Sequence, residues 1–209
     1  YQEWGGMSVI PESITCFVLP AHETVTMLTE QAKQILKQWG GTGFYGYQSH
    51  QPSDVYYQMA AIYQVLQAKE FEYQTPQANF EQAGQMVQPP DKVLEKQLGN
   101  CFDLTLLYAG CLEALGLHPI IIWMQNHVFI GCWVRDMCFS SAVQDDYQLL
   151  RSKVGTDIYL IETTVCVTGD ENYTFEEAVE LGSRNLDAQK RFRYIVDVFQ
   201  SRQLGIQPL

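Results

Sequence analysis

The sequence predicts an α+β fold in which a helical layer packs against an antiparallel β-sheet. Apolar residues recur at helical spacing over positions 24–39 and 53–66, whereas two apolar, β-rich runs at 120–124 and 127–134 are separated by only two residues. A connection that short joins antiparallel strands. The apolar fraction of 46% is enough for a real core. We therefore expect a single domain over residues 1–209, and because the chain opens on Tyr1 rather than Met, we expect it to be a segment of a longer protein.

The first half of the chain is expected to be mainly helical. The run at 13–19 is rich in β-formers and stops at Pro20, which predicts a strand. Helical spacing predicts one helix at 24–39, ended by Gly40 and Gly41, and a second helix from Ser53 to Leu66. Less regular segments complete this half: a Gly- and Tyr-rich loop at 43–52, a short strand at 71–73, and a Gln- and Pro-rich connection at 75–90.

The second half should hold one strong helix and most of the sheet. Asn100 is placed to cap a helix at 101–115 that Gly116 ends. Trp123, Trp133, Phe129 and Tyr108 are expected in the core. The remaining predicted elements are a short helix at 91–98, strands at 120–124, 127–134, 157–167 and 193–199, a polar excursion at 136–153, and a helix opened by the capping box Thr174-Phe175-Glu176-Glu177.

Charge and hydropathy exclude some classes of function. The net charge of −11 and the pI of about 4.7 argue against binding of nucleic acid by this segment, because a phosphate backbone needs a concentrated basic face. Lys190, Arg191 and Arg193 form the one short basic cluster, which we interpret as a solvated face. No apolar run approaches the ~18 residues of a membrane span, so we predict no membrane association.

The six cysteines are typical of reduced thiols in a cytoplasmic protein. They form no CxxC motif and lie in apolar segments, which disfavours a zinc site or a disulfide framework, and we predict neither a metal nor a cofactor. Cys132 and Cys138 could form a disulfide across a hairpin. Cys111 lies among the apolar residues on the inward face of the helix predicted at 101–115, so we interpret it as structural.

Three polar residues form a candidate catalytic site. Cys101 opens the predicted helix, where a thiolate is favoured, His127 begins a strand after a turn, and Glu162 interrupts an apolar strand. A thiol needs a base, and the base needs a partner that fixes its tautomer. Taken singly, each residue has an ordinary explanation: a buried small hydrophobe, a surface histidine, an exposed glutamate. Together they predict convergence at a solvent-reachable groove, with Asp103 turned away from the sulfur.

A longer pattern carries a family resemblance. Gly99-x-Cys101-x-Asp103, the segment 114–119 (ALGLHP), His127-x-Phe129 and Glu162-Thr163-Thr164 together resemble the transglutaminase-like branch of the papain-like cysteine proteinase superfamily. The match covers a core at 91–167, and it is similar to the transglutaminase-like segment of large bacterial proteins that carry helicase-like ATPase modules. The resemblance implies a papain-like fold with the nucleophile on the central helix.

The resemblance also implies a role for each residue. Cys101 would be the nucleophile, His127 the general base and acid, and Glu162 the orienting carboxylate, where the family usually has Asp. Phe129 stands where the family commonly has Trp, and Gln97 is the nearest candidate for the second oxyanion donor.

The resulting prediction is thiol-dependent attack on an amide of a protein or peptide substrate, by a peptidase or amidase. Two alternatives remain open at this point: a transglutaminase that uses an amine acceptor, and an inactive interaction module that kept the fold. A regulatory role, linked to nucleic acid through other domains of a longer parent protein, is a further possibility.

Overall fold

The fold is built around a five-stranded antiparallel sheet with strand order β7-β9-β5-β6-β8. The computed structural model describes residues 2–4, 10–43, 45–75, 85–167, 169 and 172–209. The expected α+β class with an antiparallel sheet is confirmed. The strands of this sheet are β5 (Pro119–Met124), β6 (His127–Trp133), β7 (Val143–Gln144), β8 (Ile158–Ile161) and β9 (Phe192–Asp197).

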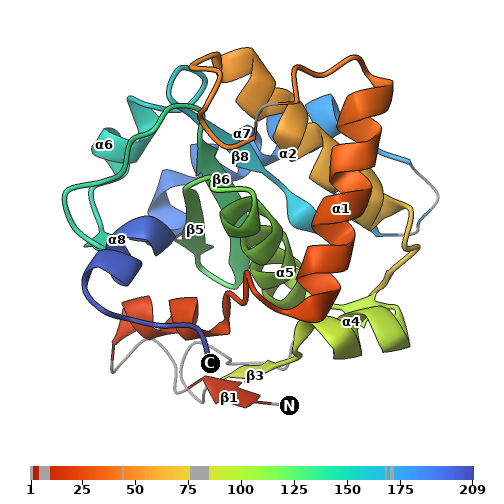
Figure 1. Cartoon of the computed structure of the whole chain (residues 1–209). Coiled ribbons are helices and arrows are strands. Elements are labelled where there is room, and N and C mark those ends of the chain that lie inside the picture. The colour runs from red at the N-terminus through yellow and green to blue at the C-terminus, as the bar shows by residue number, and fades with distance from the viewer. Residues whose placement is uncertain (1, 5–9, 44, 76–84, 168, 170–171) are drawn as a thin grey trace.

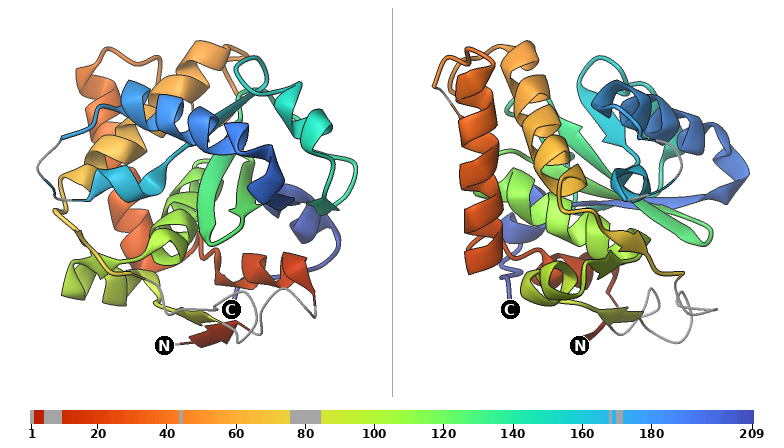
Figure 2. Two further views of the ribbon diagram at one scale, coloured as in Figure 1. Left: turned by 180° about the vertical axis from the view of Figure 1, so that it is seen from behind. Right: turned by 90° about the vertical axis from the view of Figure 1, so that its right-hand side faces the viewer.

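Helices cover both faces of the sheet (Figures 1 and 2). On one face α5 (Cys101–Ala114) lies against β5 and β6, and α1 (Glu23–Gln38) and α2 (Pro52–Gln67) pack outside it. On the other face α7 (Phe175–Asp187) packs on the edge strand β8. The sequence had predicted a single helical layer, and the second layer is an addition to it. The shorter helices are α4 (Pro90–Lys96), α6 (Tyr147–Arg151) and α8 (Val198–Gln203).

The two faces of the sheet contribute to two separate cores. Along β5, Ile121 and Trp123 belong to the cluster that contains α5, while Ile120 and Ile122 belong to a second cluster that includes Leu186 of α7. Because both faces are buried, β5 and β6 are apolar at nearly every position rather than alternating. The four aromatic residues expected in the core, Tyr108, Trp123, Phe129 and Trp133, are all buried.

One predicted strand is absent, and a second is shorter than predicted. The segment 13–19 forms the 3₁₀-helix η1 (Pro11–Phe17) instead of a strand. Pro11 presets the backbone of a first helical turn, and the Ser13 and Thr15 hydroxyls donate to the carbonyls of residues 10 and 12, which favours tight turns over a ladder. The strand predicted at 157–167 ends at Ile161, and Glu162 then caps the 3₁₀-helix η2 (Thr163–Cys166).

The remaining elements differ from prediction mainly at their ends. The three long helices and the strands β5 and β6 lie where the sequence predicted them. The strand predicted at 193–199 is β9, which turns into α8 at Val198. The excursion at 136–153 contains β7 and α6. Of the long connection at 75–90, residues 76–84 lie outside the described residues, and β3 (Gln85–Val87) pairs with β1 (Gln2–Trp4).

One short parallel pair matters for the site. Strand β2 (Glu72–Tyr73) pairs with β4 (Leu98–Gly99), so Tyr73 is level with Gly99, just before α5 begins. The Glu72 N–H donates to the Gln97 carbonyl at 2.8 Å, which fixes this register.

Two further observations concern the whole described chain. All six cysteines are free, including Cys132 and Cys138, so the hairpin disulfide that the sequence allowed is not formed. In the part of the chain that the structure describes, no helix combines the length and the apolarity that crossing a bilayer requires.

Candidate functional site

The N-terminus of α5 is fixed by a reciprocal cap. The Asn100 side chain accepts from the Phe102 and Asp103 N–H groups at 2.9 and 3.0 Å, and the Asp103 carboxyl accepts from the Asn100 N–H. Asp103 also accepts from the backbone and side-chain nitrogens of Gln88 at 3.0 and 3.1 Å. Burial raises the pKa of Asp103, although these hydrogen bonds oppose the shift. Asp103 is therefore occupied with Gln88 and Asn100, as expected for a residue turned away from the sulfur.

Cys101 is the first residue of α5 and contacts two polar side chains. Its thiol hydrogen-bonds the imidazole of His127 and the hydroxyl of Tyr73. The residue is only 1% exposed, which corrects the expectation of a thiol open to solvent. The thiol nevertheless has a polar and partly exposed neighbour, because Tyr73 is 43% exposed and reaches the thiol with its hydroxyl.

The Tyr73 hydroxyl lies against the first backbone N–H of α5. The backbone N–H of Cys101 donates to the Tyr73 hydroxyl, which also bonds the Cys101 thiol. Burial, and then the neighbouring Cys101, raise the pKa of Tyr73, so the phenol stays neutral and keeps a proton to donate. The sequence did not single out this residue. The strand at 71–73 was predicted, but nothing in the sequence indicated that it pairs with the residues before Cys101.

His127 stands at the start of β6, directly after the turn that joins β5 to β6. Asn126 adopts a φ of 62°, a left-handed conformation that Asn tolerates well, and Met124 pairs with His127 across the hairpin. His127 Nε2 lies 2.6 Å from Glu162 Oε2. An ionised carboxylate only accepts, so Nε2 carries a proton and Nδ1 is left for the thiol.

Charge and hydrogen bonding set the protonation of this pair. Burial alone would lower the pKa of His127, but its hydrogen bonds to Cys101 and Glu162 outweigh burial and raise the pKa to about 10. Burial alone would raise the pKa of Glu162, but hydrogen bonds from His127 and Thr164 hold it below its ordinary value. The pair therefore favours an imidazolium beside a carboxylate.

Glu162 is held by four donors. Oε1 accepts from the Thr164 N–H and hydroxyl at 2.9 and 2.6 Å, and Oε2 accepts from His127 and from Asn185 Nδ2. The Glu162 N–H donates to the Ala178 carbonyl at 3.0 Å, which joins this segment to α7. Glu162 is 5% exposed, so the ordinary explanation of an exposed glutamate does not apply. Asn185 lies on α7, and its role had no signal in the sequence.

The structure brings together three of the four predicted site residues. Cys101, His127 and Glu162 converge, whereas Gln97 does not join them. Gln97 is an exposed, left-handed residue at the end of α4, and its side-chain amide donates to the Lys69 carbonyl at 2.9 Å. Its contribution is through its backbone, which positions β2 and hence Tyr73.

The other cysteines differ from Cys101 in their surroundings. Cys111 and Cys166 are buried, and burial raises the pKa of each thiol to about 12, which favours an inert, protonated group. Among the described residues, no cluster of three or more His, Cys, Asp or Glu side chains is arranged to hold a metal ion.

A cavity of about 410 Å³ adjoins the imidazole. We call it the His127 cavity. Its apolar wall is formed by Met124, Val165 and Leu181, and its polar groups include His127, Glu162, Asn185 and Arg191. Cys101 and Tyr73 do not belong to the described lining of this cavity.

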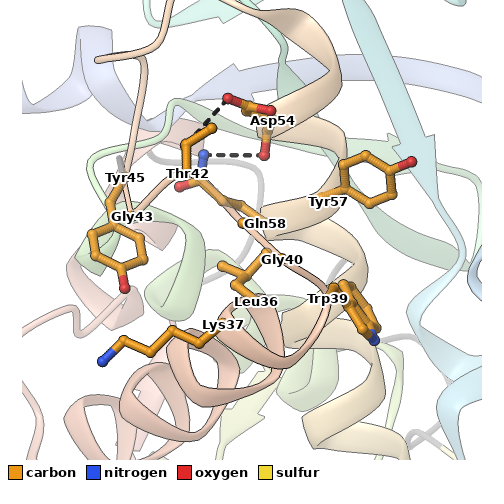
Figure 3. Close-up of a pocket in the computed structure, with 11 residues that line it drawn as sticks. Leu36, Lys37, Trp39, Gly40, Thr42, Gly43, Tyr45, Asp54, Tyr57 and Gln58 are labelled. Atoms are coloured by element: carbon orange, nitrogen blue, oxygen red, sulfur yellow. Dashed lines mark hydrogen bonds between the residues drawn. The ribbon is translucent and has the colours of Figure 1, made fainter.

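A second cavity, of about 220 Å³, lies between the end of α1 and the start of α2 (Figure 3). Trp39 and Tyr57 form one side and Lys37 and Tyr45 the other. The buried amide of Gln58 is already bonded to the backbone of Gly46. The described lining of this cavity contains no thiol or imidazole, so it offers no nucleophile or base.

Comparison with known protein families, with curated proteins and with solved structures finds no match to this chain.

Proposed function

We propose that this protein is a cysteine-dependent amide acyl-transfer enzyme, a peptidase or amidase that works through a thioester acyl-enzyme. One observation carries the proposal: a single imidazole hydrogen-bonds both the Cys101 thiol and the buried carboxylate of Glu162. Each partner has the position that covalent catalysis needs, with the nucleophile against the base and the base against a group that orients it.

The proposed reaction follows from these contacts. With the thiol proton already on His127, the Cys101 sulfur forms a bond to the carbonyl carbon of the amide while the carbonyl π pair moves to oxygen. When the intermediate collapses, the C–N bond breaks and His127 returns the proton to the leaving nitrogen. Water then attacks the thioester, His127 accepts its proton, and the C–S bond breaks to release the acid and restore the thiol.

Tyr73 is the proposed second donor to the oxyanion. A substrate carbonyl oxygen would displace the Tyr73 hydroxyl from the Cys101 N–H, and the shifted phenol would then donate to the same oxygen. Two preorganised donors at that point are worth several kcal/mol of transition-state stabilisation, since removing one such donor costs about 10²–10³ in rate in well-studied enzymes. The same movement of Tyr73 uncovers the sulfur.

We also propose that the fold belongs to the transglutaminase-like branch of the papain-like superfamily. Support comes from the chain order of Cys101, His127 and Glu162, from a nucleophile in the first turn of a helix packed on an antiparallel sheet, and from Thr164 two residues after the acid. Six free cysteines support a reducing, cytoplasmic setting for this proposed enzyme.

One observation favours a second candidate function. Because Cys101 is 1% exposed beneath Tyr73, the same geometry suits an interaction module in which the thiol never meets a substrate. A transglutaminase would use the same acyl-enzyme and differ only in its acceptor.

The test is turnover of a complex peptide mixture, followed by mass spectrometry, with the Cys101→Ala variant as the matched control. A peptidase produces new peptide termini, an amidase acting on glutamine side chains produces a gain of about 1 Da (amide to acid), and a transglutaminase incorporates an added primary amine. Any of the three products, absent with Cys101→Ala, supports the acyl-enzyme, and the first two support hydrolysis. Identical mixtures from both proteins would overturn catalysis and leave the interaction module.

A further inference from the structure

The His127 cavity adjoins the imidazole that would protonate the leaving group of the proposed reaction. His127 gives its proton to the leaving nitrogen, so that nitrogen must come within hydrogen-bond reach of the imidazole. The oxyanion lies on the other side, at the Cys101 N–H and Tyr73. The cavity is lined by His127 and not by Cys101 or Tyr73. A leaving nitrogen held between the thiol and the imidazole could therefore extend the rest of its group past the ring toward this cavity.

A guanidinium is fixed at this cavity by the same turn that positions the base. The Gln125 N–H donates to the Arg191 carbonyl at 2.6 Å, and Arg191 Nη2 donates to the Gln125 carbonyl at 3.0 Å. Gln125 lies in the turn between β5 and β6, two residues before His127. These two bonds tie Arg191 to the turn that precedes His127.

The charge of Arg191 is not neutralised by its neighbours. Arg191 is exposed and makes no ion pair with any carboxylate of the described chain, whereas Arg151, Arg184 and Arg202 each pair with an Asp or Glu. Lys190 and Arg193 add to the local positive charge, in a chain whose net charge is −11. The sequence suggested only a solvated face for this cluster, but Arg191 lines the cavity beside the base.

We infer that the His127 cavity is the leaving-group and acceptor subsite, and that it selects amines that carry a carboxylate. The carboxylate would pair with Arg191, while Met124, Val165 and Leu181 cover the apolar part of the same group. This inference rests on the proposed acyl-transfer function, and it names the substrate class: amides whose amine part is acidic. In the acceptor direction, the amine nitrogen bonds to the acyl carbon, the C–S bond breaks, and His127 takes the amine proton.

The experiment measures which amine the acyl-enzyme chooses. Cys101 is acylated with p-nitrophenyl acetate, and equal concentrations of two dipeptide amides compete for the acetyl group: glycyl-glutamate α-amide and glycyl-glutamine amide. The two share one attacking amine and differ only in a carboxylate versus a carboxamide. We expect the acidic dipeptide to be acetylated about tenfold more, as for one charge-assisted pair. The same competition between glycyl-aspartate α-amide and glycyl-asparagine amide repeats the test with a side chain that is one methylene shorter.

Variants assign the preference to one residue. Arg191→Gln should abolish the preference for the acidic dipeptide, and Arg191→Glu should reverse it. Arg184→Gln is the matched control, because Arg184 is an exposed arginine of α7 that does not line the cavity, and it should keep the wild-type ratio. Equal acetylation of both dipeptides by the wild type, or a preference that survives Arg191→Gln, would overturn the inference.

A binding measurement separates this inference from the proposed function. The Cys101→Ala protein is titrated with the same dipeptides, and the methyl signals of Val165 and Leu181 are followed by NMR. The subsite is supported if only the acidic dipeptide causes saturable shifts of these signals and if the shifts disappear in the Cys101→Ala/Arg191→Gln double variant. This result would support the subsite even if no acyl-enzyme forms. If acyl-enzyme forms but neither dipeptide shifts these signals, the subsite is wrong and the proposed function stands.

Discussion

Replacing Glu162 by Gln should remove most of the turnover while leaving the fold nearly intact. The carboxylate accepts four hydrogen bonds, two at each oxygen, from Thr164 and from the His127 and Asn185 side chains. An amide of the same shape has one oxygen and one NH₂ group, so one end of the side chain changes from acceptor to donor.

The Thr164 backbone N–H decides which end that is. A backbone N–H cannot be turned into an acceptor, so the Gln oxygen should face Thr164 and the NH₂ group should face His127 and Asn185. The Asn185 amide can flip to present its oxygen, and His127 can lose the proton on Nε2 while it keeps the proton on Nδ1. Every buried group is then still paired, and the free energy of unfolding should fall by only about 1 kcal/mol.

The cost appears in the rate. With its proton on Nδ1, the imidazole faces the Cys101 thiol with a donor and cannot take the thiol proton. A wrong tautomer of this kind costs about 10⁴ in the serine protease triad, and we expect a loss of about 10³–10⁴ in the rate of acylation here. The assay is the burst of p-nitrophenol from p-nitrophenyl acetate, with imidazole ¹⁵N shifts reporting the tautomer.

The control for this prediction is Glu180→Gln. Glu180 is an exposed residue of α7 that pairs with Arg184, and its loss should leave the burst unchanged. A loss below tenfold for Glu162→Gln, or an unchanged His127 tautomer, would refute the orienting role of the carboxylate.

Three further predictions concern the neighbours of this pair. Tyr73→Phe should lower the acylation rate about 10²–10³-fold in burst kinetics, because the oxyanion loses a donor. A faster burst would instead mean that the Tyr73 hydroxyl only blocks access to the thiol. Because the pKa of His127 is raised to about 10, activity should decline above about pH 10, and the decline should begin at lower pH in Glu162→Gln. The proton on His127 stabilises the folded state fully below the ordinary histidine pKa of 6.5, so the free energy of unfolding should fall as pH rises from 6.5 toward 10. A free energy of unfolding that does not change over this pH range would contradict the raised pKa of His127. Gly182→Ala should destabilise the protein by about 1–3 kcal/mol in urea unfolding, since its Cβ would lie 2.8 Å from backbone atoms of β8, whereas the adjacent Ser183→Ala should be nearly neutral.

The fold class could be predicted because local signals and tertiary packing agree over most of the chain. The Asn100 cap and the apolar face of α5, and the two-residue separation of β5 from β6, gave the central helix and hairpin directly. The segment at 13–19 failed because side-chain hydroxyls bond to its own backbone, a local competition that β-propensity ignores. The second helical layer was missed even though the nearly continuous apolar runs of β5 and β6 are typical of a sheet covered on both faces.

The site could be predicted only in part. Cys101, His127 and Glu162 were found because each stands at the edge of a regular element, where its residue type is unusual. Tyr73 and Asn185 come from elements whose neighbours depend on tertiary pairing, β2 on β4 and α7 on β8. Gln97 was chosen for its nearness in sequence, whereas the left-handed backbone at its position turns its side chain toward Lys69.

The most direct test of the central claim is the covalent intermediate itself. Intact-protein mass spectrometry after brief exposure to p-nitrophenyl acetate, followed by peptide mapping, identifies which thiol is acylated. We predict one acetyl group, on Cys101, that forms in the wild type and is strongly reduced in His127→Ala. Acetylation spread over the more accessible Cys16 and Cys138, with Cys101 unmodified, would contradict it.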